Sequence, residues 1–172
     1  MANKTIENIK NRVSCRSYSE KKVSLKKVLE IAEAGKYAPS GKNRQIANIF
    51  VVNSKSKVEK LRNLSLKNLG RDCMYGAKTI ILVGAPREDM FTDKDCSCIL
   101  ENMFLAAHAL KLASCWINQF DDLFNTKNGL KVKRALGIPE NYKIVGSCIL
   151  GYPQDEASLQ VKERKVDFIK VL

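Results

Sequence analysis

Two short basic clusters, one near each end of the chain, contain the residue types that bind an anion. Arg12-Val13-Ser14-Cys15-Arg16-Ser17 is the first, and Lys162-Glu163-Arg164 is the second. Planar guanidinium groups bind phosphate oxygens in pairs, and a hydroxyl group between them adds another hydrogen-bond donor. We therefore expect the fold to bring both clusters to one ligand, and a phosphorylated cofactor is the first hypothesis.

A third polar segment, Ala38-Pro39-Ser40-Gly41-Lys42-Asn43-Arg44-Gln45, places hydrogen-bonding side chains on a predicted loop. The loop follows a predicted helix that has Ser24 as its N-cap and apolar residues at helical spacing. The helix is expected to end at Pro39, because proline cannot continue it. A buried strand over 49–52 is predicted after the loop.

The rest of the chain alternates irregularly between predicted helices and strands. Apolar runs predict strands over 79–84, 114–117 and 142–150, and helical spacing predicts helices over 6–11, 56–69, 93–112 and 131–136. This pattern predicts an α+β fold in which helices flank a sheet. Apolar residues cover more than one stripe of the helix over 93–112, so we expect it to be buried on most sides, partly by a second subunit.

Length and composition indicate one globular domain over residues 1–172. Hydrophobic residues make up 45% of the chain and charged residues 28%, and no apolar run reaches the roughly 18 residues that a membrane span needs. The first residues lack the apolar core of a secretory signal. We therefore expect a cytoplasmic protein that has no membrane partner.

Metal and nucleic-acid sites are not expected. The six cysteines are scattered, and the close pair Cys96-Ser97-Cys98 has no second pair or histidine nearby, so we expect reduced, mostly buried thiols. The net charge of +12 comes with lysines spread along the chain, without interleaved aromatics or a nucleic-acid-binding motif. Such a basic surface can attract anionic nicotinamide dinucleotides.

An ordered series of motifs along the chain resembles the nitroreductase family of FMN-dependent oxidoreductases. The series spans almost the whole chain, and it is the order of the motifs that makes the resemblance specific. From the N-terminus the motifs are Arg12-x-Ser14-x-Arg16-x-Tyr18, Ala38-Pro39-Ser40-Gly41-x-Asn43-x-Gln45, Asp95 through Asn102, Leu105-Ala106-Ala107, Ser114-Cys115-Trp116-Ile117, Leu150-Gly151-Tyr152-Pro153 and Lys162-x-Arg164.

The resemblance implies a fold, a cofactor and a reaction. The fold would be α+β, a central, mostly antiparallel sheet flanked by helices, in an intertwined homodimer with two FMN sites at the subunit interface. NADH or NADPH would reduce the flavin and leave, and a nitroaromatic, a quinone or a related small-molecule electron acceptor would then take its place in a ping-pong mechanism. The chemistry would take place at N5 of the flavin, so the resemblance implies no catalytic side chain and no metal.

The resemblance also assigns roles to individual residues. Arg12, Lys162 and Arg164 would hold the FMN phosphate, in agreement with the two basic clusters. Ser14 would meet the ribityl-phosphate region, and Arg16 would lie near the pyrimidine edge of the flavin. A cation at that edge stabilises the anionic reduced ring.

The other implied contacts come from the loop and from two strand ends. Pro39, Ser40 and Asn43 would line the flavin site of the partner subunit. The remaining implied contacts are Ile117, Asn118 and Gln119 near the reactive face of the ring, and Leu150 and Gly151 against the cofactor.

The chain departs from the family pattern in several places. Ile46-Ala47-Asn48 follows Gln45 where the family often has Pro-Trp, and Lys111-Leu112-Ala113 stands where a Gly-Leu-Gly turn is common. A further contact to the flavin pyrimidine has no clean match, and Asn68 and Arg71 are its candidates. The chain is also short, so we expect an open or shallow substrate site.

Three alternatives to this function remain. One is a family relative specialised for another flavin reaction, such as dehalogenation, flavin breakdown or a biosynthetic oxidation. Another is a non-catalytic flavin-binding or redox-sensing protein, for which tight FMN binding without nicotinamide oxidation would be the sign. The third is a basic nucleic-acid-binding domain, for which steeply salt-dependent binding to DNA or RNA would be the sign.

Overall fold

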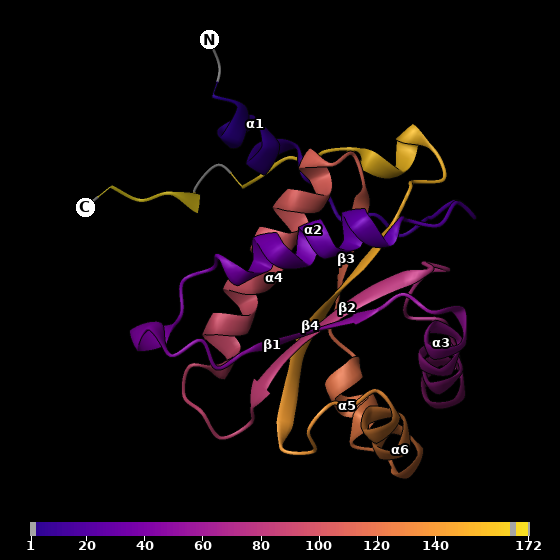
Figure 1. Ribbon diagram of the computed structural model, residues 1–172. Helices are drawn as coiled ribbons and strands as arrows, with labels where there is room; N and C mark the ends of the chain where they lie inside the picture. The colour runs from indigo at the N-terminus through magenta and orange to yellow at the C-terminus, as the bar shows by residue number, and fades with distance from the viewer. Residues whose placement is uncertain (1–2, 166–167, 172) are drawn as a thin grey trace.

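A four-stranded antiparallel sheet forms the centre of the protein (Figure 1). The computed structural model describes residues 3–165 and 168–171, so residues 1–2, 166–167 and 172 of the predicted domain lie outside the described part. The strands are β1 (Asn48–Val52), β2 (Thr79–Pro86), β3 (Ala113–Ile117) and β4 (Tyr142–Gly151), in the spatial order β1-β2-β4-β3. Their pairings are antiparallel, which confirms the expected α+β fold with a mostly antiparallel sheet.

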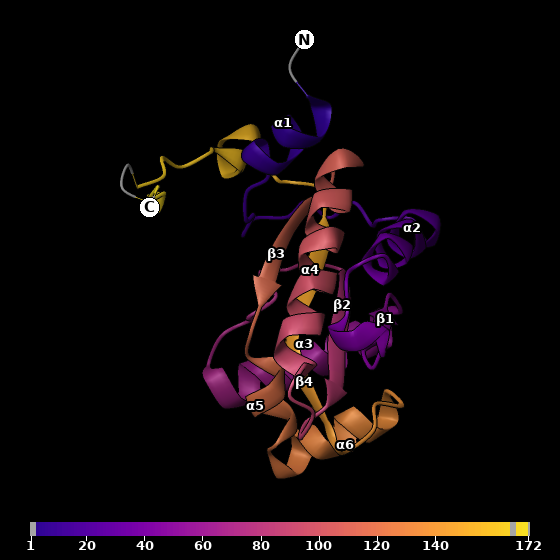
Figure 2. The same cartoon turned by 90° about the vertical axis from the view of Figure 1, so that its left-hand side faces the viewer.

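Helices cover both faces of this sheet (Figures 1 and 2). On one face lie α2 (Leu25–Lys36) and α4 (Thr92–Ala109), and on the other α3 (Lys55–Leu69), α5 (Phe120–Phe124) and α6 (Lys127–Ala135). The N-terminal helix α1 (Lys4–Asn11) lies beside the C-terminal end of α4. Asn8 Nδ2 holds it there by donating a hydrogen bond to Leu105 O at 3.0 Å.

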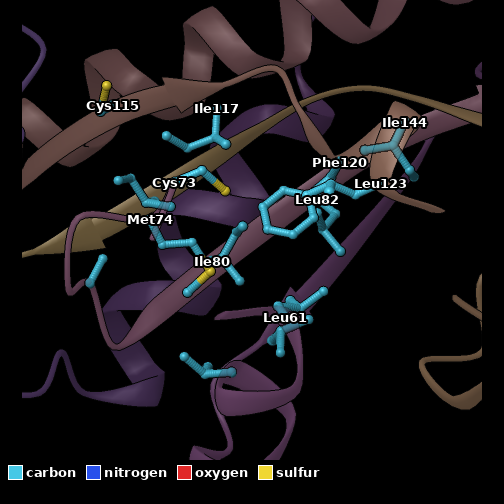
Figure 3. Close-up of a cluster of buried hydrophobic side chains, with 14 of the residues drawn as sticks. Leu61, Cys73, Met74, Ile80, Leu82, Cys115, Ile117, Phe120, Leu123 and Ile144 are labelled. Carbon is cyan, nitrogen blue, oxygen red and sulfur yellow. The ribbon is translucent and has the colours of Figure 1, made fainter. Parts of the chain in front are cut away.

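The apolar run of β2 contributes to two hydrophobic clusters at once. Ile80 and Leu82 pack on the side of α3 and α5, whereas Ile81 and Val83 pack on the side of α2 and α4. Figure 3 shows the first cluster, in which Leu61 of α3 and Phe120 of α5 meet the sheet. A strand buried on both faces explains why this run has no alternating polar residues.

Local signals in the sequence predicted the helices well, with differences at their ends. Ser24 caps α2 as expected by accepting a hydrogen bond from Lys27 N. The helix ends at Lys36 instead of continuing to Pro39, since the residue before a proline is kept out of the helical conformation. Helix α4 ends at Ala109, three residues before the predicted end, and Lys111 takes a left-handed φ of 57°.

The helices after β3 were predicted only in part. Helix α5 was not predicted, and α6 begins at Lys127, four residues before the expected start. Thr126 explains that start, because its hydroxyl accepts a hydrogen bond from Gly129 N at 3.0 Å.

Within the single chain, α4 is buried on one side, and its expected burial on most sides, partly by a second subunit, stays a prediction. Its buried residues, such as Leu100, Met103 and Ala107, face the sheet and α2, whereas Ile99 and Leu105 are only half-buried. None of the helices formed by the described residues combines the length and the apolarity that crossing a membrane requires.

Candidate functional site

The segment that carries the first basic cluster is held between the ends of two strands. Cys15 N donates a hydrogen bond to Ser114 O at 2.9 Å, where β3 begins. Ser19 N donates to Tyr152 O at 2.9 Å, just after β4 ends. These backbone bonds fix the segment 12–19 at one corner of the sheet.

Alternate side chains of this segment point in opposite directions. Cys15 is completely buried, whereas Ser14 and Arg16 are exposed and Arg12 is half-buried. Arg12 is anchored weakly, because its Nε lies 3.8 Å from Glu101 Oε1. The guanidinium groups and the hydroxyl that the sequence singled out are therefore accessible to a ligand.

A cavity of about 420 Å³ opens beside Arg12. Ser114 and Pro153 line it from the two strand ends, and Leu159 and Val161 line it from the C-terminal segment. That segment begins with the short helix η2 (Glu156–Leu159) and runs past α1 (Figure 1). The fold thus brings the two ends of the chain to one cavity.

The second basic cluster follows directly on the cavity lining. Lys162 and Arg164 are exposed and come one and three residues after Val161. The structure places them beyond the cavity wall, and their contact with a phosphate stays a prediction.

The guanidinium groups also influence the pKa values of the buried cysteine thiols nearby. Burial raises the pKa of the Cys115 thiol, and the nearby Arg16 guanidinium opposes this shift. Burial also raises the pKa of the Cys148 thiol. Both thiols therefore stay protonated near neutral pH, and neither is a nucleophile.

The end of β3 carries the segment expected near the reactive face of the flavin. Ile117 is buried, and its carbonyl oxygen accepts a hydrogen bond from Ser147 Oγ at 3.0 Å. Asn118 is exposed and Gln119 half-buried, and the Gln119 side chain accepts a hydrogen bond from Asn118 N. Asn118 and Gln119 thus place polar groups at this edge of the sheet. The backbone just before them is held in place by its contacts with β4.

Leu150 and Gly151 lie in the core at the end of β4, and both are buried. The Leu150 side chain belongs to the hydrophobic cluster under α2 and α4. A contact of these residues with a cofactor stays a prediction.

The loop expected to serve the partner subunit lies far from the first basic cluster. Its backbone bonds to Asp95 in the first turn of α4, whereas the cavity at Arg12 is lined by His108 near the other end of that helix. His108 comes thirteen residues after Asp95 along the helix, which corresponds to about 20 Å. The single chain therefore does not bring Pro39, Ser40 and Asn43 to the cavity.

Asn68 and Arg71, the candidates for a pyrimidine contact, lie where α3 ends. Both are exposed, and Asn68 Nδ2 donates a hydrogen bond to Leu64 O at 2.8 Å. The turn between them is formed by Gly70, which has a φ of 67°.

Asp95, the first residue of one of the motifs in the sequence, makes a contact with the loop that the sequence did not predict. Its carboxylate is buried and accepts a hydrogen bond from Gly41 N at 2.9 Å. An acidic residue among the apolar positions of a long helix was the available signal.

Comparison with known proteins gives consistent matches over nearly the whole chain. The family model described as "Nitroreductase family" matches residues 9–152. A protein from Archaeoglobus fulgidus, provisionally named an NADH dehydrogenase/NAD(P)H nitroreductase, is 30% identical over 153 residues, which cover 86% of this chain and 84% of that protein.

Solved structures share the fold. A nitroreductase with bound FMN from Bacteroides fragilis NCTC 9343 superposes with a TM-score of 0.91 at 32% identity, covering 99% of this chain and 100% of that chain. A second nitroreductase with bound FMN, from Desulfitobacterium hafniense DCB-2, has a TM-score of 0.87 at 26% identity, and each chain is covered completely. The chain described above belongs to the nitroreductase family.

Proposed function

We propose that this protein is an FMN-dependent oxidoreductase that takes electrons from NADH or NADPH and passes them to a small-molecule acceptor such as a nitroaromatic or a quinone. The observation that carries the proposal is the exposed face of the segment 12–16 beside a cavity lined by both ends of the chain. The relatives named for NAD(P)H and the related structures with bound FMN support the same function.

The residues present fit the phosphate end of FMN. Arg12 and Arg16 offer guanidinium donors, Ser14 offers a hydroxyl, and none of the three is buried. Lys162 and Arg164, which follow the cavity lining, would add two more positive charges around the phosphate. FMN, when bound, supplies a ring nitrogen that accepts and later donates a hydride.

The chain's own residues would orient the cofactor and stabilise its charge. Arg16 would place a positive charge at the pyrimidine edge, where reduction adds negative charge. Ile117, Asn118 and Gln119 would lie near the reactive face, with their backbone held by β4. Donor and acceptor would bind in turn at that face, which is the ping-pong order.

The complete site would require two subunits in an intertwined homodimer. Pro39, Ser40 and Asn43 lie about 20 Å along α4 from the cavity at Arg12, too far for one chain to use both. Large apolar side chains are also exposed on the described surface, as an interface between subunits would need. They include Ile6, Ile9, Leu25, Leu29, Tyr37, Phe168, Ile169 and Val171. A single domain, an open substrate site and a cytoplasmic location remain part of this proposal.

The visible absorbance spectrum of the purified protein tests this function, recorded before and after anaerobic addition of NADH and, separately, of NADPH. Two flavin bands that bleach on addition are the expected result. Bands that do not bleach would favour the non-catalytic flavin-binding alternative. Protein that stays colourless after incubation with FMN and desalting would contradict the proposed function.

A further inference from the structure

The loop between α2 and β1 has an unusual backbone at three positions. Lys42, Asn43 and Gln45 have φ values of 55°, 55° and 50°. L-residues rarely adopt this left-handed conformation, and it persists only where the surrounding structure holds it. The contacts that hold the loop therefore show which residues maintain this conformation.

The main anchors come from the start of α4 and from the turn before it. Gly41 N donates a hydrogen bond to Asp95 Oδ1 at 2.9 Å. Gly41 also lies directly against the Phe91 ring, because a Cβ there would fall 2.4 Å from ring carbons. Arg44 forms an ion pair with Asp89.

Other hydrogen bonds stay within the loop. Ser40 Oγ accepts from Gln45 N at 3.2 Å, and Gln45 Nε2 donates to Asn43 Oδ1 at 3.0 Å. Among the described residues, Asp95 is thus the one buried side chain that bonds the backbone of the loop. It links the loop to the helix that packs on the sheet.

A buried aspartate such as Asp95 is energetically unfavourable if its only role is to anchor the loop. Its residue surface is 4% exposed, and its second oxygen, Oδ2, is buried without a hydrogen-bond partner among the described residues. A buried, unsatisfied carboxylate oxygen is unfavourable, and asparagine would offer Gly41 N an acceptor without the charge. The position of Asp95 near the N-terminus of α4 favours the negative charge that remains.

We propose that Asp95 is a positioning residue that holds the segment 40–45 in the shape that presents Ser40 and Asn43 to the flavin of the partner subunit. The inference rests on the proposed function, because the target of the loop is the partner's FMN site. In this role Asp95 acts through its hydrogen bond to Gly41 N.

FMN titration of the full-length protein tests this role. We expect Asp95→Ala and Gly41→Ala to weaken FMN binding at least tenfold, since one removes the acceptor and the other forces the loop off Phe91. Asp95→Asn should have a smaller effect because it keeps an acceptor. Asp93→Asn is the matched control: Asp93 lies in the same turn, is exposed and pairs with Lys143, so FMN affinity should stay unchanged.

A double-mutant cycle separates positioning from general destabilisation. In an Asn43→Ala background, Asp95→Ala should change FMN affinity much less than it does in the wild type, because a residue that it positions is already gone. An equal loss of affinity in both backgrounds would overturn the positioning role.

The same titrations distinguish this inference from the proposed function. Wild-type protein that binds FMN, together with Asp95→Ala and Gly41→Ala variants that bind it equally well, would contradict the positioning role alone. Wild-type protein that binds no FMN would contradict both.

Discussion

The ring of Tyr18 lies directly against the backbone of Gly151, where β4 ends. A Cβ on Gly151 would fall 2.5 Å from a ring carbon of Tyr18. The Tyr18 hydroxyl is buried and donates a hydrogen bond to Cys15 O at 2.8 Å. Tyr18 thus connects the end of β4 to the segment 12–16 and supports that segment.

Gly151→Ala should therefore affect both stability and cofactor binding. The added methyl group would push Tyr18 away, and overpacking of this kind typically lowers the free energy of unfolding by about 1–3 kcal/mol. We also expect weaker FMN binding, because the segment 12–16 would move. Urea unfolding and FMN titration measure the two effects.

Gly137→Ala is the control for this substitution. Gly137 has a φ of 75° and no atom near an added Cβ, so the variant should lose stability through backbone strain alone and keep its FMN affinity. Wild-type stability in Gly151→Ala would show that the Tyr18 contact is not tight.

Removing one phosphate-binding charge should weaken FMN binding without unfolding the protein. We expect Arg12→Ala and Arg164→Ala to reduce FMN affinity about tenfold to a hundredfold, as loss of charge-assisted hydrogen bonds of about 1.5–3 kcal/mol would do. Arg134→Ala removes the same charge from the exposed surface of α6 and should bind FMN normally. Unchanged affinity in both test variants would refute the phosphate assignment.

Lys133 is a buried lysine that closes the turn between α6 and β4. Its Nζ donates hydrogen bonds to Glu140 O at 2.9 Å and Tyr142 O at 2.6 Å, and the residue is 2% exposed. We expect Lys133→Met to lower the free energy of unfolding by about 2–4 kcal/mol, because two carbonyl groups lose their charged donor. Chemical denaturation measures this, with the exposed Lys131→Met as the control; equal stability of the two variants would be the contrary result.

The cysteines should differ sharply in reactivity. Cys98 is exposed, whereas the other five are buried. Burial raises the pKa of Cys96 to about 12, so its thiolate stays scarce even at pH 9. Native protein should therefore react with a thiol reagent at no more than one residue, and Cys98→Ser should abolish that reaction.

Thiol counting with and without denaturant checks this expectation. Denatured protein should reveal all six cysteines of the sequence. Rapid modification of two or more thiols in the native state would contradict the buried, protonated state of the other five.

Local features of the fold could be predicted because their causes lie within a few residues. The N-cap at Ser24 and the apolar run of β2 are examples, since capping and strand periodicity depend on near neighbours. Helix α5 could not be predicted, because a five-residue helix has too few turns for a periodic signal. Its burial against the sheet stabilises it instead.

Part of the candidate site could also be predicted from residue types. Arg12, Ser14 and Arg16 stood out by their residue types, and in the structure Ser14 and Arg16 are exposed and Arg12 is half-buried. The hydrogen bond of Asp95 to the loop was not predicted, because its partner Gly41 lies 54 residues away in the sequence. No local pattern records such a pairing.

The sequence by itself determined the family, the position of most helices and strands, and the residue types available for a phosphate. Only the tertiary structure decided the strand order β1-β2-β4-β3, the meeting of both chain ends at one cavity, and the distance of the loop 38–45 from that cavity. The physical reason is that capping and periodicity act between near neighbours. Strand order and site assembly instead depend on packing between residues far apart in the chain.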